Sequence, residues 1–146
     1  MEVNDPRTEA LAIATRALAR REHSRRSLQE RLRRAGVPED DAQAVVEELQ
    51  QVGLVDDGRF AEERARVLAE RGKGDAAIRF ELERAGVGSA EVEAALATLD
   101  PERERAANLV ERRGATPETA RLLAGRGFDE DVVAALVAPE PWGPLG

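Results

Sequence analysis

The sequence predicts an all-α protein in which three tandem three-helix repeats form an elongated, curved array. Ala, Leu, Arg and Glu dominate the composition, and all four favour helix. Apolar residues recur at the spacing of one helix face, while the alternation typical of strands does not persist anywhere. A short helix that ends in Gly plus an apolar residue recurs at Gly36-Val37, Gly86-Val87 and Gly127-Phe128, with glycines 50 and 41 residues apart. Periods in this range are typical of stacked helical repeats.

The first repeat is predicted over residues 7–53. Its first helix follows Pro6 and carries an apolar stripe of Leu11, Ala14 and Leu18. Ser24 is the expected N-cap of the second helix, because its hydroxyl can accept from free N–H groups of the first turn. Gly36 suits the left-handed position at the end of that helix. The expected core residues of the second and third helices are Leu28, Leu32, Ala42, Val45, Val46 and Leu49.

The second repeat, residues 54–99, has the same order. Asp56 or Asp57 is expected to cap a helix that carries Phe60, and Gly72 and Gly74 separate it from the next helix. Ile78 and Leu82 match the leucine pair of the first repeat. Ser89 is expected to cap the third helix, whose apolar residues follow those of the first repeat by 50 positions: Val92, Ala95, Leu96 and Leu99.

The third repeat, residues 100–138, is less regular. Asp100-Pro101 and Thr116-Pro117 each read as a cap followed by proline at the first helical position. Asp129 is expected to cap the last helix. The expected apolar positions are Ala106, Leu109, Val110, Leu123, Val132, Val133, Leu136 and Val137. Residues 139–146 form a proline-rich tail, expected to be extended or disordered, in which Trp142 either docks on a neighbour or faces solvent.

Several functional classes find no support in the residues. The chain has no cysteine, which excludes disulfides and thiolate metal sites, and no apolar run near the ~20 residues that cross a bilayer. The N-terminus lacks the features of a secretory signal, so we expect a cytoplasmic monomer. His23, the one histidine, is expected to be exposed among arginines, and neighbouring acids point to different helix faces. We therefore expect no catalytic residue, no metal, no cofactor and no enzymatic activity.

Charge is unevenly distributed along the chain. The net charge of −7 argues against a protein that coats DNA, yet residues 7–34 hold nine arginines against three acids. Residues 35–57 hold seven acids and no base, so the third helix of the first repeat cannot serve as a basic DNA-reading helix. Arginine binds carboxylate or phosphate through paired hydrogen bonds. The predicted partner-binding residues are Arg20, Arg21, Arg25, Arg26, Lys73 and Arg79.

Three motifs in order resemble the RecX family of bacterial regulators of the RecA recombinase. They are Arg20-Arg21-Glu22-His23-Ser24-Arg25-Arg26-Ser27-Leu28, the run Gly53-Leu54-Val55-Asp56-Asp57-Gly58-Arg59-Phe60-Ala61, and the segment from Lys73-Gly74 through Ile78, Glu81-Leu82 and Gly86-Val87. The resemblance extends over about residues 10–138. It implies three tandem three-helix repeats that bind the RecA nucleoprotein filament and inhibit its ATPase, strand exchange or filament growth, in DNA repair and the SOS response.

Two alternatives remain open from the residues. One is an acidic helical-repeat adaptor for a different protein partner. The other is a nonspecific DNA binder that uses the basic N-terminal helices, whose affinity for naked DNA would fall steeply with salt. The net charge weakens the expectation of direct DNA contact.

Overall fold

A computed structural model describes residues 5–137, which form nine α-helices and no strand. The helices are α1 Pro6–Arg20, α2 Arg25–Arg34, α3 Glu39–Gln51, α4 Asp57–Glu70, α5 Asp75–Arg84, α6 Ser89–Ala97, α7 Glu102–Arg113, α8 Pro117–Gly125 and α9 Glu130–Leu136. The all-α prediction is confirmed. The predicted tail 139–146, with Trp142, lies outside the described residues.

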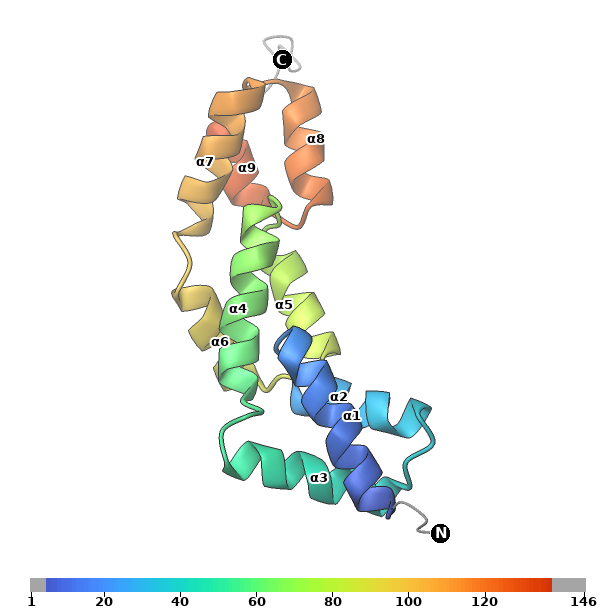
Figure 1. The fold of residues 1–146 in the computed structure, drawn as a ribbon. Helices are drawn as coiled ribbons and strands as arrows, with labels where there is room; N and C mark the ends of the chain where they lie inside the picture. Colours follow the sequence, from blue (N-terminus) through green and yellow to red (C-terminus); the bar gives the residue numbers. More distant parts are fainter. Residues whose placement is uncertain (1–4, 138–146) are drawn as a thin grey trace, which may run out of the picture.

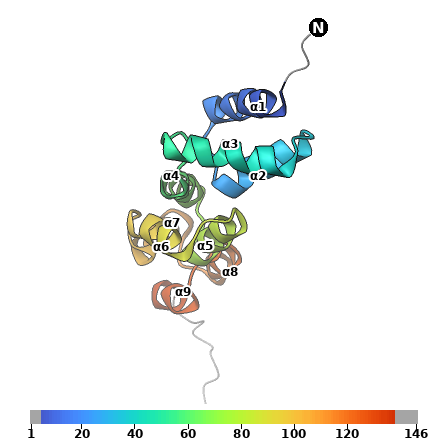
Figure 2. The same cartoon turned by 90° about the horizontal axis from the view of Figure 1, so that it is seen from below.

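Successive groups of three helices follow one another along the long axis of the molecule (Figure 1). The helices α1–α3 form one end, α4–α6 the middle and α7–α9 the other end. In the view turned by 90°, α1–α3 stay apart, whereas α7 and α8 overlap α5 and α6 (Figure 2). Each group has its own apolar cluster. Val55, in the link after α3, is buried in the first cluster. The protein is therefore an array with three small cores.

The middle helix of each group supplies the centre of its core. Leu28 and Leu32, Ile78 and Leu82, and Leu123 are all fully buried, as their matching sequence positions predict. Each of these helices ends in a Schellman motif, in which the N–H two residues past the cap donates to a carbonyl one turn earlier: Val37 to Leu32, Val87 to Leu82 and Phe128 to Leu123. The glycines at these ends have φ near +90°, which explains why glycine recurs there.

The apolar stripe predicted for the first helix is wrong in detail. Its buried face consists of Ala10, Ala14 and Ala17, while Leu11 is exposed and Leu18 is only partly buried. Alanine allows the axis of α1 to approach α3 closely, and a leucine at the contact would hold the helices apart. Phe60, expected in the core, is also only partly buried, packing against the rim of the second cluster.

Four of the expected helix caps are confirmed and two are wrong. Ser24, Asp56, Thr116 and Asp129 each accept a backbone N–H of the first turn. Ser89 is instead the first residue of α6 and makes no capping bond. Pro101, and not Asp100, occupies the N-cap position of α7, because the backbone of Pro101 is itself extended (ψ 143°) and the helix begins only at Glu102.

The middle helices meet end to end. The Ser24 hydroxyl, at the start of α2, donates to the carbonyl of Ala85 at the end of α5 (2.7 Å). At the next junction the backbone N–H of Gly74, at the start of α5, donates to the carbonyl of Arg126 at the end of α8 (2.8 Å). Each junction thus satisfies polar groups that a helix end leaves without an intrahelical partner.

A carboxylate from the following repeat reinforces each junction. Asp57 Oδ1 accepts the backbone N–H of Arg25 (2.8 Å), and Glu102 Oε2 accepts that of Asp75 (2.6 Å). Both donors are first residues of middle helices, where a negative charge complements the helix dipole. The second junction adds Arg105, which is largely buried and pairs with Asp75 Oδ1 at 2.9 Å. Repeats one and two, and two and three, are therefore joined in the same way.

We predict that Gly74→Ala destabilises the protein by about 1–3 kcal/mol, because its methyl group would lie 2.4 Å from the carbonyl oxygen of Gly127. Gly125→Ala is the matched control: it lies at the end of α8 with no atom within 4 Å of the added carbon. That variant should be neutral or up to about 1 kcal/mol more stable, since alanine favours helix. Urea unfolding measures both changes, and equal losses in the two variants would contradict the junction.

Candidate partner-binding surface

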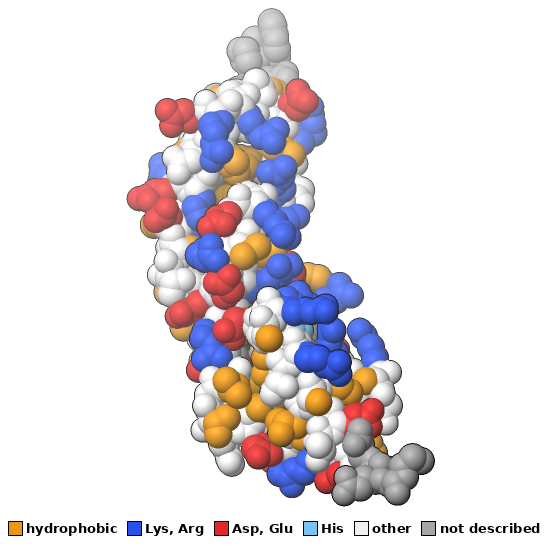
Figure 3. All heavy atoms as spheres, viewed as in Figure 1, with side chains coloured by type: hydrophobic (Ala, Val, Ile, Leu, Met, Phe, Trp, Pro, Cys, Tyr) orange, Lys and Arg blue, Asp and Glu red, His pale blue; other side chains and the backbone are white. Residues whose placement is uncertain are grey.

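Four of the predicted binding residues surround the link between α1 and α2. Arg20 ends α1, Arg21 follows it, and Arg25 and Arg26 begin α2. Figure 3 shows Lys and Arg side chains gathered here, where the end of α1 meets α2 and the C-terminal end of α5. The end-to-end junction thus brings the basic segment of the first repeat against the second repeat.

The four arginines differ in solvent exposure. Arg20, Arg21 and Arg26 are exposed, and none forms a salt bridge within residues 5–137. Arg25 is half-buried at the junction with Asp57, and its Nε is enclosed. Three of these side chains can therefore reach a partner, whereas Arg25 is held against its own protein.

Arg26 lies across the end of α5. A side chain at Gly86 would come within 2.7 Å of Arg26 Nε and 2.8 Å of its Cβ, so glycine leaves the space that this arginine occupies. The stem of Arg26 covers the backbone while the guanidinium stays at the surface, as long basic side chains commonly do. Arg26 therefore extends the basic surface from the first repeat onto the second.

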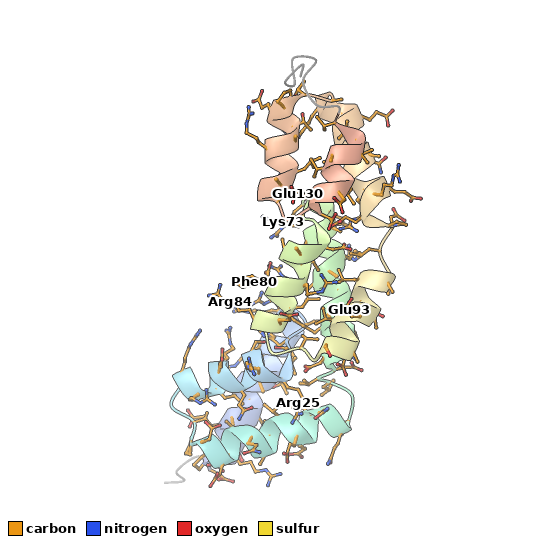
Figure 4. All side chains as sticks on the ribbon, turned by 180° about the vertical axis from the view of Figure 1, so that it is seen from behind. Arg25, Lys73, Phe80, Arg84, Glu93 and Glu130 are labelled. Carbon is orange, nitrogen blue, oxygen red and sulfur yellow. The ribbon has the colours of Figure 1, made fainter. Side chains whose placement is uncertain are left out.

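The predicted residues of the second repeat are separated. Arg79 pairs with Glu93 of α6 at 2.9 Å, and the hydrogen bond raises the pKa of Arg79 and lowers that of Glu93. Lys73 lies between α4 and α5, and its carbonyl accepts from Arg105. Figure 4 shows Lys73 on the side of α5 away from Glu93. The structure thus places Lys73, but not the Arg79–Glu93 pair, on the same side as the exposed residues described next.

Sequence reasoning missed two residues of this surface. Phe80 is 65% exposed, and Arg84 follows it by one helical turn. Figure 4 shows Lys73, Phe80 and Arg84 succeeding one another along one side of α5. Their sequence signal is their offset from the buried Ile78–Leu82 face. We call these exposed residues, together with the half-buried Lys73, the basic edge, which consists of Arg20, Arg21, Arg26, Lys73, Phe80 and Arg84.

The basic edge has the composition of an interaction surface. Aromatic residues and arginine are enriched at protein interfaces. Covering a large exposed aromatic side chain with a partner is favourable because it removes apolar surface from water. Phe80 is the one aromatic residue that is mostly exposed among residues 5–137. The arrangement supplies an apolar anchor flanked by positive charges.

The expected exposure of His23 is wrong. Only 4% of the residue is accessible, because the α1–α2 link turns the ring inward, where Nδ1 lies 3.4 Å from Ser27 Oγ. Burial, followed by the charges of Arg21 and Arg31, lowers the pKa of His23, and the Ala17 carbonyl and Glu22 oppose that shift only in part. His23 therefore serves the packing of the link.

Other kinds of site find little material here. Within residues 5–137, no three metal-ligating side chains come together. In the same part of the chain, no helix is both long and apolar enough to cross a membrane.

Comparison with known proteins decides the family. Residues 10–49 match the family description "RecX, first three-helix domain", and residues 56–96 match "RecX, second three-helix domain". The chain belongs to the RecX family. The Regulatory protein RecX of Mycolicibacterium smegmatis is 38% identical over 95% of this chain and 85% of its own length. That of Stenotrophomonas maltophilia is 39% identical over 85% of this chain and 82% of its own.

Solved RecX structures share the fold. RecX from Lactobacillus salivarius superposes with a TM-score of 0.77 at 20% identity, covering 92% of this chain and 96% of its own. A second crystal structure of regulatory protein RecX gives a TM-score of 0.76 at 22% identity, over 90% of this chain and 73% of its own. The all-helical array is thus the RecX fold, and curated RecX relatives are named regulatory proteins.

We predict that His23 makes folding less favourable at acidic pH. Its folded-state pKa is lowered, so below about pH 6.5 the unfolded chain binds a proton that the folded chain binds less readily. The free energy of unfolding should therefore fall between about pH 7.5 and about pH 5.5. His23→Gln should show a smaller difference between these two conditions in urea unfolding. An unchanged difference would mean that His23 does not titrate in this range.

Proposed function

We propose that this RecX-family chain is a non-enzymatic regulator that binds the RecA nucleoprotein filament through its basic edge. Binding restrains ATP hydrolysis and strand exchange and favours filament disassembly. The observation that carries the proposal is the continuity of the basic edge across the α2–α5 junction, with unpaired arginines beside an exposed Phe80. Such a surface suits a partner that presents an acidic rim around an apolar pocket. The protein acts in the cytoplasm as a monomer.

The array shape supports a specific mode of action. Hydrogen bonds at each junction hold the three repeats as one elongated body. A body that contacts two neighbouring filament protomers gains affinity because the second contact forms within an existing complex. It shifts the equilibrium between two arrangements of the protomers only to the extent that it binds one arrangement more tightly than the other. We infer that it holds adjacent protomers against the movement that accompanies ATP turnover.

Direct DNA binding fits the surface less well. The net charge is −7, and the exposed side of α3 carries several acids, which would repel a phosphate backbone. An adaptor role for another protein partner would use the same kind of surface, but the RecX relatives favour the recombination partner. The two alternatives therefore differ from the proposal in the partner that they require.

A RecA ATPase assay on single-stranded DNA tests the proposed function. We expect that substoichiometric amounts of the purified protein lower the rate of ATP hydrolysis. The same protein should bind naked single-stranded DNA weakly at physiological salt. Unchanged ATPase activity in the presence of excess protein would reject the proposal. Tight, steeply salt-dependent binding to naked DNA would favour the nonspecific DNA binder instead.

We predict that Phe80→Ala weakens binding to the filament by about tenfold, because truncating a central aromatic residue of an interface typically costs more than 1 kcal/mol. Val52→Ala is the matched control, since Val52 is 66% exposed and lies at the end of α3, away from the basic edge. The concentration that halves RecA ATPase activity measures both effects. Equal potency of the two variants would remove Phe80 from the interface.

The arginines are tested in the same assay. Replacing Arg20, Arg21 and Arg26 together by alanine should reduce potency and make the remaining inhibition less sensitive to salt. Arg25 is left intact because its side chain is packed at the junction. Thermal unfolding of each variant confirms that the fold is retained.

A further inference from the structure

A second basic surface lies at the junction between the second and third repeats. A cavity of about 840 Å³ opens between the C-terminal end of α4, the link after α6 and the length of α7. Figure 3 shows Lys and Arg side chains gathered on this face, where α7 and α8 meet the end of α4. None of the residues of the basic edge lines this cavity. The two surfaces are therefore distinct.

The rim of the cavity carries unpaired positive charge. Four arginines line it without a salt bridge within the described residues, namely Arg71, Arg112, Arg113 and Arg126. Two further lining arginines are already paired, Arg66 with Glu63 and Glu70, and Arg105 with Asp75. One unpaired acid, Asp100, also lines the cavity.

The negative C-terminal ends of nearby helices balance only part of the positive charge of these arginines. The helices α4, α6 and α7 end at the cavity, and each C-terminus contributes roughly half a negative charge. Basic residues at these positions stabilise their own helices, which is a sufficient reason for one or two of them. Three helix ends, Asp100 and the surplus charge of the two carboxylates that share Arg66 together offset about three and a half of the four unpaired charges. The cavity therefore keeps a small net positive charge, and its four unpaired arginines remain free to pair with carboxylates of a partner.

The floor of the cavity is aliphatic. Ala69, Leu99 and Leu109 contribute to the lining, and all three are only partly buried. Phe128 also borders the cavity, but it is nearly buried and its ring is covered by the Arg105 guanidinium at 6.0 Å. No aromatic face is therefore open for a base to stack on, which is how single-stranded nucleic acid is commonly held. An aliphatic side chain suits this floor better than a base does.

We propose that this cavity docks an acidic segment of a protein partner. Carboxylates of the segment pair with Arg71, Arg112, Arg113 and Arg126, and an apolar side chain enters the floor between Leu99 and Leu109. Charge complementarity selects the segment, and the apolar side chain fixes its register. The proposal is independent of the basic edge, so the array can hold one partner at two places or two partners at once.

The probe for this site is a fluorescein-labelled peptide in which two leucines are flanked on each side by three glutamates. Fluorescence anisotropy with the full-length chain at low salt should show saturable binding. Replacing the glutamates by glutamines, or the leucines by glycines, should weaken binding at least about fivefold, since each removes one of the two contacts. Absence of saturable binding would overturn the proposal.

Matched variants on α7 place the peptide. Arg112→Glu reverses a charge on the rim, and Arg103→Glu makes the same change on an exposed part of the helix outside the cavity. We expect Arg112→Glu to weaken binding about tenfold and Arg103→Glu no more than about twofold. Equal effects would mean that the peptide senses overall charge only, which contradicts a site.

An oligothymidylate of equal charge separates a protein partner from nucleic acid. If the oligothymidylate binds weakly, and Arg112→Glu leaves that binding unchanged, the result supports the proposal. Binding tighter than the peptide that is lost in Arg112→Glu would overturn it in favour of a nucleic-acid site. The RecA ATPase assay tests the basic edge, and the peptide assay tests this cavity. A negative peptide result therefore rejects the cavity proposal without rejecting the proposed inhibition of RecA.

Discussion

The end-to-end contact of the middle helices is the constraint on which the rest of the structure depends. The end of α5 meets the start of α2, and the end of α8 meets the start of α5, with hydrogen bonds of 2.7 and 2.8 Å between them. Carbonyls left free at one helix end thereby find donors at the next, and aligned helix dipoles meet with opposite ends. The three small cores become one body. The same contact places Arg26 beside the end of α5, and so makes the basic edge continuous.

The two junctions solve this problem with different residues. At the first junction a hydroxyl, that of Ser24, fills the contact and also caps its own helix. At the second junction Gly74 lets the two backbones touch, so that no side chain fills the contact. Arg105 then joins the repeats from the side through Asp75 and the Lys73 carbonyl. The arginine-lined cavity opens beside this polar contact, and a smaller cavity, bordered by Arg25, Arg26 and Arg33, lies beside the first junction.

Sequence reasoning was most successful where the determinant is local. The buried leucine pairs and the glycine stops follow from helical periodicity and from the left-handed backbone that each stop requires, so Leu28, Leu82 and Gly86 were placed correctly. Long-range packing decided the rest. Alanines, and not Leu11, form the buried face of α1 because α1 lies close to α3. His23 is buried because the link between α1 and α2 turns its ring inward. Neither the buried face of α1 nor the burial of His23 can be predicted from residues within one helical turn. The end-to-end junctions join residues such as Ser24 and Ala85 that are far apart in the chain, and no periodicity predicts them.

The candidate site shows why a basic residue in the sequence is a weak sign of a binding site. Within residues 5–137, seven arginines form salt bridges with acids, and some of these pairs join different repeats, as Arg59 does with Glu22 and as Arg105 does with Asp75. Arg79 resembles a candidate in sequence but its charge is already neutralised by Glu93. Net charge is equally uninformative, because it adds the acids of α3 to arginines that lie elsewhere on the molecule. What distinguishes a binding arginine is that the fold leaves it exposed and unpaired beside apolar surface. Arg84 meets this condition next to Phe80, and its one sequence signal is its offset from the buried Ile78–Leu82 face.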